Sequence, residues 1–418
     1  MENTSFTDIE VKSKQINPHR FTCIIILLMT ISQMAVTIYL PAMPSMVIAL
    51  NTHPNLIQLS LIIFIFAYGC SQFFYGPLSD VYGRRLIVLV GLSIFTVATL
   101  IAACSTNIYL FLIARALQGM GIGCGDTMGR AIMCDTFKGQ EFVKAASYIS
   151  MAATLTPLFA PILGGYLDFY FGWRSCFIFL LGYGSLCLLL LQHYLPETNN
   201  KRYVINIKGI LNRYTFIIRN RIFLGFFIPG LVSFFGETVY SMISPFLLQT
   251  KLGYSSVEFG WLTIYIVGGL LIGALIAKIL AYKVSHHTMV FVGLCTLLLG
   301  GFCMLIPALS NWMTAFHIIL PMVIFTIGVG ITYPNTNMGA LAPFTAMAGT
   351  AGALQGGLQM FITGFAGLGL AHIQAKSQLP LAIILTLCAA VGLICFKILL
   401  KSTNPLDDPV KENNENPS

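Results

Sequence analysis

Charged residues are scarce in this sequence. They make up 9% of its 418 residues, while hydrophobic residues make up 56%. A soluble domain carries about 25% charged residues, so this composition excludes an ordinary water-soluble fold. The sequence also lacks the runs G-x-x-x-x-G-K-[ST], H-E-x-x-H and G-x-S-x-G. It therefore gives no sign of ATP, zinc or serine hydrolase chemistry, and we predict neither an enzyme nor a bound cofactor.

Long apolar runs occupy most of the chain, and a transmembrane helix needs about 20 such residues. Twelve runs lie near 21–41, 55–75, 86–104, 108–132, 144–166, 174–194, 222–246, 259–280, 288–308, 312–334, 349–371 and 379–399. The predicted fold class is therefore an all-α membrane protein with twelve transmembrane helices in two six-helix bundles. The predicted segments are a tail at 1–20, a bundle at 21–194, a linker at 195–221, a bundle at 222–400 and a tail at 401–418.

The positions of Lys and Arg predict the orientation. With the N-terminus in the cytoplasm, 18 of the 23 basic residues fall on the cytoplasmic side and three on the outer side, while Arg115 and Arg130 lie within a span. Positive residues collect in cytoplasmic loops, so the net charge of +8 reflects topology and predicts no nucleic-acid partner. We expect a monomer that crosses the inner (cytoplasmic) membrane of a bacterium many times, surrounded by lipid, with both termini in the cytoplasm.

The polar run between the second and third spans reads Gly76-Pro77-Leu78-Ser79-Asp80-Val81-Tyr82-Gly83-Arg84-Arg85. Gly83 permits a tight turn, and Asp80 can face the positive N-terminus of a helix in the other bundle. Basic residues here can pair with acids or with lipid phosphate. We predict a cytoplasmic gate latch made of Gly76, Asp80, Gly83, Arg84, Arg85, Arg130 and Asp135. The alternative is a pair of arginines that only follow the positive-inside rule.

This run fits the pattern G-x-L-x-D-x-x-G-R-R and resembles the loop signature of the major facilitator superfamily. Further matches make the chain similar to the Bcr/CflA branch of drug:proton antiporters. They are Tyr39-Leu40-Pro41-Ala42, Arg115-Ala116-Leu117-Gln118-Gly119, Ala160-Pro161-Ile162-Leu163-Gly164-Gly165, Leu195-Pro196-Glu197-Thr198 and Tyr333-Pro334-Asn335. The resemblance implies a secondary transporter with no cofactor, driven by the proton gradient. It also associates Arg115 with proton transfer; packing or anion binding is the alternative.

One departure from the family pattern concerns the first span. The family usually has an Asp two residues before the Tyr of its Y-L-P-A motif, and this chain has Thr37 there. That position is a usual candidate for proton or substrate coupling. The replacement therefore puts proton coupling at this position in doubt.

Two acids lie within other spans. A charge in the bilayer costs about 2.5–3.5 kcal/mol, so Asp126 and Glu237 should face a cavity between the bundles. Asp126 either replaces the acid missing at Thr37 or pairs with Arg130, four residues later. Hydrocarbon favours the neutral form of an acid, so Glu237 could exchange a proton or bind a cationic substrate. The alternative for Glu237 is a carboxyl group held neutral by nearby hydroxyl groups.

The fifth span contains Pro157, Pro161, Gly164 and Gly165. Their spacing resembles a weakened form of the antiporter motif, in which proline kinks the helix and glycine allows close helix contact. This favours export, although an ordinary kinked packing face would look the same.

These features together predict proton-coupled efflux of a small organic molecule or drug by alternating access. We expect the substrate to bind between the bundles, near Gln118, Asp126, Glu237 and Asn335. The first alternative is uptake of a metabolite or amino acid by symport with protons, which the residue at Thr37 leaves open. The second is a membrane sensor that has lost transport.

Overall fold

The computed structural model describes residues 18–199, 207–281, 283–370 and 377–400. All regular structure in these residues is helical. The predicted tails lie outside them, apart from residues 18–20. A membrane-spanning segment must satisfy its own backbone polar groups, and a helix does so within one segment, so apolar runs of this length become helices.

The first bundle and the segment after it hold nine helical elements. These are α1 (Pro18–Thr37), η1 (Leu40–Ala42), α2 (Met43–Ala49), α3 (Pro54–Tyr82), α4 (Arg84–Cys104), α5 (Ile108–Thr136), α6 (Gly139–Phe171), α7 (Arg174–Tyr194) and α8 (Ile207–Ile218). The second bundle holds eight. These are α9 (Arg221–Pro245), η2 (Phe246–Lys251), α10 (Ser256–Leu280), α11 (His286–Leu309), α12 (Ala315–Leu341), η3 (Ala342–Met347), α13 (Ala348–Leu370) and α14 (Leu379–Leu400).

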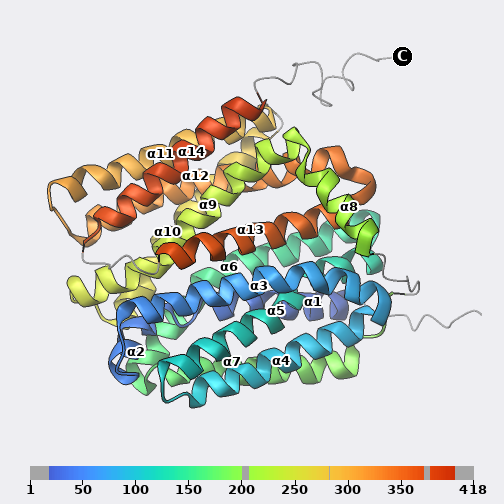
Figure 1. The fold of residues 1–418 in the computed structure, drawn as a ribbon, viewed down its shortest axis with the longest axis horizontal. Coiled ribbons are helices and arrows are strands. Elements are labelled where there is room, and N and C mark those ends of the chain that lie inside the picture. The colour runs from blue at the N-terminus through green and yellow to red at the C-terminus, as the bar shows by residue number, and fades with distance from the viewer. Residues whose placement is uncertain (1–17, 200–206, 282, 371–376, 401–418) are drawn as a thin grey trace, which may run out of the picture.

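Eleven helical stretches among the described residues are long and apolar enough to cross a membrane. The remaining long helix, α13, has 23 residues, and its glycines and two glutamines make it less apolar. Figure 1 shows α1–α7 in one bundle and α9–α14 in the other. The predicted fold class, a membrane protein of twelve long helices in two bundles, is confirmed.

The predicted turn at 76–85 is mostly helix. α3 continues through Pro77 to Tyr82, and the chain turns only at Gly83, whose φ is 97°. Pro77 lies five residues before the end of α3, where its ring removes one backbone hydrogen bond without ending the helix. Gly83 ends the helix because its backbone conformation is one that other residues rarely adopt.

The two bundles meet along two helix pairs, α3 with α13 and α6 with α10. Figure 1 shows α3 and α13 side by side at the boundary between the bundles. Glycines bring their backbones together: a Cβ at Gly69 would lie 2.8 Å from a backbone atom of Phe361, and one at Gly364 would lie 2.5 Å from Phe66 Cα. Such close approach is typical of small residues at membrane helix contacts.

The two ends of the molecule are named here after residues at them. The Asp80 end holds the turn between α3 and α4 and the short helix α8, which packs on α13. The Trp173 end holds the turn between α6 and α7 and the short helix α2. In Figure 1, α2 and α8 lie at opposite ends of the bundles.

Candidate functional site

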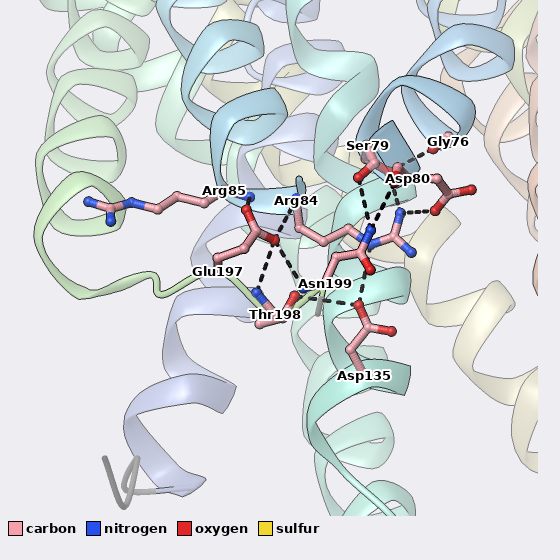
Figure 2. Close-up of polar contacts among 9 residues, drawn as sticks. All are labelled: Gly76, Ser79, Asp80, Arg84, Arg85, Asp135, Glu197, Thr198 and Asn199. Atoms are coloured by element: carbon pink, nitrogen blue, oxygen red, sulfur yellow. Dashed lines mark hydrogen bonds and ion pairs between the residues drawn. The ribbon is translucent and has the colours of Figure 1, made fainter. Parts of the chain in front are cut away.

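The polar cluster at the Asp80 end is built around Arg84, the first residue of α4. Its guanidinium group lies 2.8 Å from Asp80 Oδ1 and 3.3 Å from Asp135 Oδ2, and it also donates to Ser79 Oγ. Arg84 therefore joins α3, α4 and α5, as Figure 2 shows. These partners all belong to the first bundle. The ion pairs found in the described residues thus include none from Asp80 to the second bundle, and the latch stays a prediction.

Two arginines predicted for this cluster lie outside it. Arg85 points away from Asp80 in Figure 2 and donates from Nη2 to the carbonyl of Gln192, 2.7 Å away on α7. Arg130 lies five residues before Asp135 on α5, which rotates it about 140° around the helix. Its guanidinium group lies against α13, where a Cβ at Gly356 would be 3.3 Å from Nη2. Arg130 therefore belongs with the boundary between the bundles.

The carboxylate of Glu197 holds the start of the linker against the N-terminus of α4. It accepts hydrogen bonds from the backbone N–H groups of Arg84 at 2.8 Å and Arg85 at 3.3 Å, and from those of Thr198 and Asn199 at 3.0 Å. A negative charge at a helix N-terminus is favourable, because the N–H groups there have no partner within the helix. Figure 2 shows Glu197 beside this turn, against which a side chain at Gly83 would collide.

Asn199 and Thr198 extend this contact to the neighbouring helices. The Asn199 side chain donates to the carbonyls of Ser79 and Asp80, both at 3.3 Å, and Thr198 Oγ1 lies 3.4 Å from Asp135 Oδ2. We call residues 197–199 the linker clasp. The linker clasp was not predicted as part of the candidate site, although Leu195-Pro196-Glu197-Thr198 was one of the matching motifs.

The Trp173 end is where hydrogen bonds join the bundles. Three hydrogen bonds between described residues of the two bundles run from Gln249 Nε2 to Pro41 O at 2.9 Å, from Ser256 Oγ to Gly165 O at 3.2 Å, and from Trp261 Nε1 to Tyr166 Oη at 3.3 Å. All three lie near this end of the helices. The bundles are therefore closed together at the Trp173 end.

The proline and glycine residues predicted as an antiporter-like kink form part of this closed end. Gly164 packs on the backbone of Ile38, and Gly165 on that of Ser256. From the other bundle, a Cβ at Gly260 would lie 2.8 Å from the carbonyl oxygen of Pro161. Any larger residue at these glycines would separate α6 from α10 or from the residue that follows α1.

Glu237 lines a cavity of about 70 Å³ between the bundles. Pro157 and Pro161 of the kink line it too, and so do Tyr240, Ser241, Ser244, Phe259, Thr263, Ile266 and Val267 of the second bundle. Within the described residues, Ser241 Oγ makes a hydrogen bond of 3.0 Å to the backbone carbonyl of Glu237. Its carboxyl group makes none there. The alternative from the sequence, a Glu237 carboxyl group held by hydrogen bonds from nearby hydroxyl groups, is therefore not seen in the described residues.

Thr37 lines this same cavity from the first bundle, together with Leu40. Its hydroxyl group is occupied by the carbonyl of Gln33, 3.0 Å away and one turn earlier in α1. The position where the family usually carries an acid thus faces the acid that this chain carries on α9. Thr37 and Glu237 were both singled out from the sequence, but no sequence pattern placed them in one cavity.

Asp126 lies elsewhere, against α3. Tyr68 Oη donates to its Oδ2 at 2.5 Å. Of the two alternatives for Asp126, the pairing with Arg130 is not seen in this structure, since the ion pairs of the described residues include none between them. Tyr68 competes successfully because it lies on the helix packed against α5, whereas Arg130 is exposed and turned toward α13.

Arg115 and Gln118 are sealed inside the first bundle, both with no exposed surface. Arg115 Nη1 donates to Gln118 Oε1 at 3.0 Å, and Gln118 Nε2 donates to Thr99 Oγ1 at 2.8 Å. The guanidinium carbon lies 4.4 Å from the ring centroid of Tyr39 and 4.1 Å from that of Phe64, as in cation–π contacts. Gln118 therefore does not line the cavity of Glu237, and no described acid pairs with Arg115.

Asn335 is likewise held within the second bundle. Its side chain accepts from His286 Nδ1 at 2.8 Å and donates to the carbonyl of Ile331 at 2.7 Å. Of the four residues predicted to surround the substrate, the structure thus leaves only Asp126 and Glu237 at the boundary between the bundles. Tyr68 and Tyr333 were missed there, because a tyrosine in a membrane span is commonly lipid-facing and its spacing gives no signal.

Comparisons with known proteins agree with this architecture. The family described as Major Facilitator Superfamily matches residues 25–368. Multidrug resistance protein D of Escherichia coli is 32% identical over 391 residues, covering 92% of this chain and 97% of that protein. Bicyclomycin resistance protein homolog of Haemophilus influenzae is 24% identical, covering 92% and 98%.

A solved structure of a D-xylose-proton symporter has the same fold, with a TM-score of 0.75 at 16% identity, covering 93% of this chain and 99% of that one. At that identity the likeness concerns the fold alone. The match to the family extends over most of the chain and includes both bundles. This multi-pass membrane protein therefore belongs to the major facilitator superfamily of transporters and resembles its Bcr/CflA branch.

Proposed function

We propose that this protein exports a small organic molecule across a bacterial cytoplasmic membrane in exchange for protons. The observation that carries the proposal is the Glu237 carboxyl group, which lines a cavity between the bundles and makes no hydrogen bond within the described residues. Ionisable groups inside membrane spans commonly serve as proton or substrate sites. A carboxyl group with neither a base nor a fixed donor beside it can change its charge when a cargo or a proton arrives.

Two features of the boundary support alternating access. The bundles are joined by hydrogen bonds at the Trp173 end, while Arg130 and Tyr333 are exposed between the bundles on the side of the Asp80 end. The distribution of Lys and Arg favours the cytoplasm for the Asp80 end. We therefore take this structure as the state that receives cargo from the cytoplasm.

The proposed cycle has two halves. Cargo enters from the Asp80 end and binds while Glu237 gives up its proton to the cytoplasm. The bundles then separate at the Trp173 end, an external proton returns to Glu237, and the cargo leaves. One charge moving through 100 mV contributes about 2.3 kcal/mol, which supports a concentration ratio of roughly fortyfold.

The linker clasp has a place in this cycle. It fixes the N-terminus of α4 beside Asp80 and Arg84 while the Asp80 end is open. In the opposite state the same charges would be available to the second bundle. The names of the relatives that we report, which concern multidrug and bicyclomycin resistance, are consistent with export of an organic compound.

Uptake by symport with protons is the second candidate. The observation in its favour is Thr37. It stands where the family usually has an acid on the first span, so the only acid among the residues that line the cavity is Glu237 of the second bundle. In symport, cargo and proton would move in the same direction. Export by exchange and uptake by symport therefore differ in the direction of the proton movement that added cargo causes.

Everted membrane vesicles provide that measurement. The cargo would first be found by comparing the culture medium of a deletion strain with that of an overexpressing strain. We expect it to release protons from the acidified lumen of vesicles that contain the wild-type protein, as reported by a pH-sensitive dye. Proton movement in the opposite direction would support symport, and no movement with any compound found in this way would contradict both.

A further inference from the structure

The short helix α8 and the turn after it carry positive charge that the proposed transport does not use. Residues 207–221 include four basic residues and no acid. Lys208, Arg213, Arg219 and Arg221 are all exposed, and the ion pairs of the described residues include none of them. A surface of this composition attracts a negatively charged partner.

The position of α8 places this charge at the membrane surface. α8 follows the last span of the first bundle, and two residues separate its end at Ile218 from the start of α9 at Arg221. It therefore lies at the level where the membrane-spanning helices end. Figure 1 shows α8 at the Asp80 end, running crosswise to the long helices. A helix in this position lies in the plane of the membrane surface, beside the lipid headgroups.

One side of α8 is held by both bundles. Ile217 is fully buried, and the ring centroid of Tyr214 lies 6.4 Å from that of Phe73 on α3. The ring centroid of Phe216 lies 6.1 Å from that of Phe344 in η3. Tyr214 thus connects α8 to the first bundle and Phe216 connects it to the second, while α8 also packs on α13.

The apolar face of α8 is wider than the part that the protein covers. At about 100° per residue, a sector of about 120° contains Ile210, Leu211, Tyr214, Ile217 and Ile218. Ile210 and Tyr214 are half-buried, whereas Leu211 is 57% and Ile218 37% exposed. These two residues extend the apolar face beyond its contact with the protein. Acyl chains at the membrane surface would cover them and remove them from water.

Basic residues border this exposed apolar strip. Lys208, Thr215 and Arg219 lie within about 40° of one another around the helix, and Leu211 lies about 60° from Lys208. Lys208 and Arg219 are about 16 Å apart along the axis. A helix with apolar residues on one side and basic residues beside them binds a membrane surface, with the apolar residues among the acyl chains and the bases at the phosphate groups.

We propose that α8 binds the headgroups of anionic phospholipids in the leaflet beside the Asp80 end. Leu211 and Ile218 lie among the acyl chains, and Lys208 and Arg219 each pair with the phosphate of a different lipid. A nucleic acid would also pair with the bases, but it would give Leu211 and Ile218 no apolar contact. This interaction goes beyond the proposed export, because it requires neither cargo nor proton.

Local quenching in lipid nanodiscs that hold the full-length protein tests this assignment. A fluorescent dye on Thr215→Cys, in a cysteine-free background, reports the lipid beside α8, because Thr215 is exposed and lies on the same side as Lys208 and Arg219. The bilayer is an equal mixture of phosphatidylglycerol and phosphatidylcholine. A quenching nitroxide is placed near the headgroup, on the acyl chain of one lipid or of the other.

We expect phosphatidylglycerol to outnumber phosphatidylcholine beside α8 at least roughly fivefold, the factor that one basic residue at a membrane surface supplies. Equal quenching by the two lipids would show that α8 does not select anionic headgroups. No quenching by either lipid would show that α8 does not lie at the membrane. Each of these two results would overturn the proposal.

Two paired variants separate a lipid site from general surface charge. Lys208→Gln combined with Arg219→Gln should return the lipid ratio beside α8 to that of the bilayer. The matched control is Lys138→Gln combined with Lys144→Gln, which removes the same charge from exposed positions at the start of α6. This control should keep the ratio of the parent protein. An unchanged ratio in the first pair, or an equal loss in the control, would contradict the assignment.

The temperature of unfolding should stay level in both pairs, because all four side chains are exposed. The nanodiscs contain no cargo and carry no proton gradient. The result is therefore independent of the proposed exchange, which the vesicle measurement tests separately.

Discussion

Glu237 and Asp126 are two acids inside the membrane-spanning region, and their surroundings differ. Glu237 lines a small cavity whose walls include no basic residue, and its carboxyl group makes no hydrogen bond within the described part of the chain. Asp126 accepts a hydrogen bond of 2.5 Å from Tyr68, and Arg130 follows it four residues later on α5. The first acid is thus free to change its charge, while the second is held in one position.

This difference argues for a division of tasks. A group that exchanges protons must be stable both with and without its charge, so fixed partners would hinder it. A group that positions a cargo benefits from fixed partners, because they keep it in the geometry that binding requires. The predictions below test the task of Glu237 and the contacts at the two ends of the molecule.

The largest effect should come from Glu237→Gln. The amide keeps the shape of the side chain but cannot release a proton, so cargo-driven proton movement should fall to background in reconstituted liposomes containing a pH-sensitive dye. Glu258→Gln is the control, because Glu258 is an exposed acid that caps its own helix at the Trp173 end. Persistent proton movement in Glu237→Gln would remove this residue from the coupling.

The next effect concerns the closed end. Gly260→Val places atoms against the carbonyl of Pro161 and should disfavour the closed state by about 1–3 kcal/mol, or roughly 5- to 150-fold in population. We expect faster labelling of Thr263→Cys in the cavity, in a cysteine-free background, by a membrane-impermeant thiol reagent applied from outside.

Gly268→Val is the matched control for this variant. Gly268 also lies on α10, but a Cβ there would meet no atom within 4 Å. Labelling should stay at the rate of the parent protein in this control. Equal rates in the two variants would show that contact at Gly260 does not keep the Trp173 end closed.

A smaller effect is expected at the linker clasp. Glu197→Gln removes a negative charge from the N-terminus of α4, which should lower the free energy of unfolding by about 0.3–1 kcal/mol. Transport should slow without losing its coupling to protons. Glu141→Gln is the comparison, because Glu141 is an exposed acid in the first turn of α6. A loss of proton coupling in Glu197→Gln would contradict a purely structural role of the linker clasp.

The fold followed from the sequence because apolar runs and short polar turns are strong signals. Twelve runs near membrane length, split by one polar stretch, gave the two bundles. The loop motif also brought together Asp80, Arg84 and Asp135, as the structure now shows.

The candidate site was harder to predict, because a helix that is apolar on all sides does not reveal which face meets its neighbours. Gln118 and Asn335 point into their own bundles, where they accept hydrogen bonds from Arg115 Nη1 and His286 Nδ1. Asp126 binds Tyr68 and not Arg130, since a partner from a packed helix can be closer than one four residues away. The contact between Glu197 and α4 could not be predicted either. Its donors are backbone N–H groups of a helix that lies far from Glu197 in the sequence, and no residue type marks them.

Infrared difference spectroscopy of the purified protein tests the central claim most directly, since a protonated carboxyl group absorbs separately from a carboxylate. We predict a protonated-carboxyl band at neutral pH in the ligand-free wild-type protein, its loss when cargo is added, and its absence in Glu237→Gln. A ligand-free protein in which Glu237 is already ionised at neutral pH, or a band that cargo leaves unchanged, would contradict proton exchange at this residue.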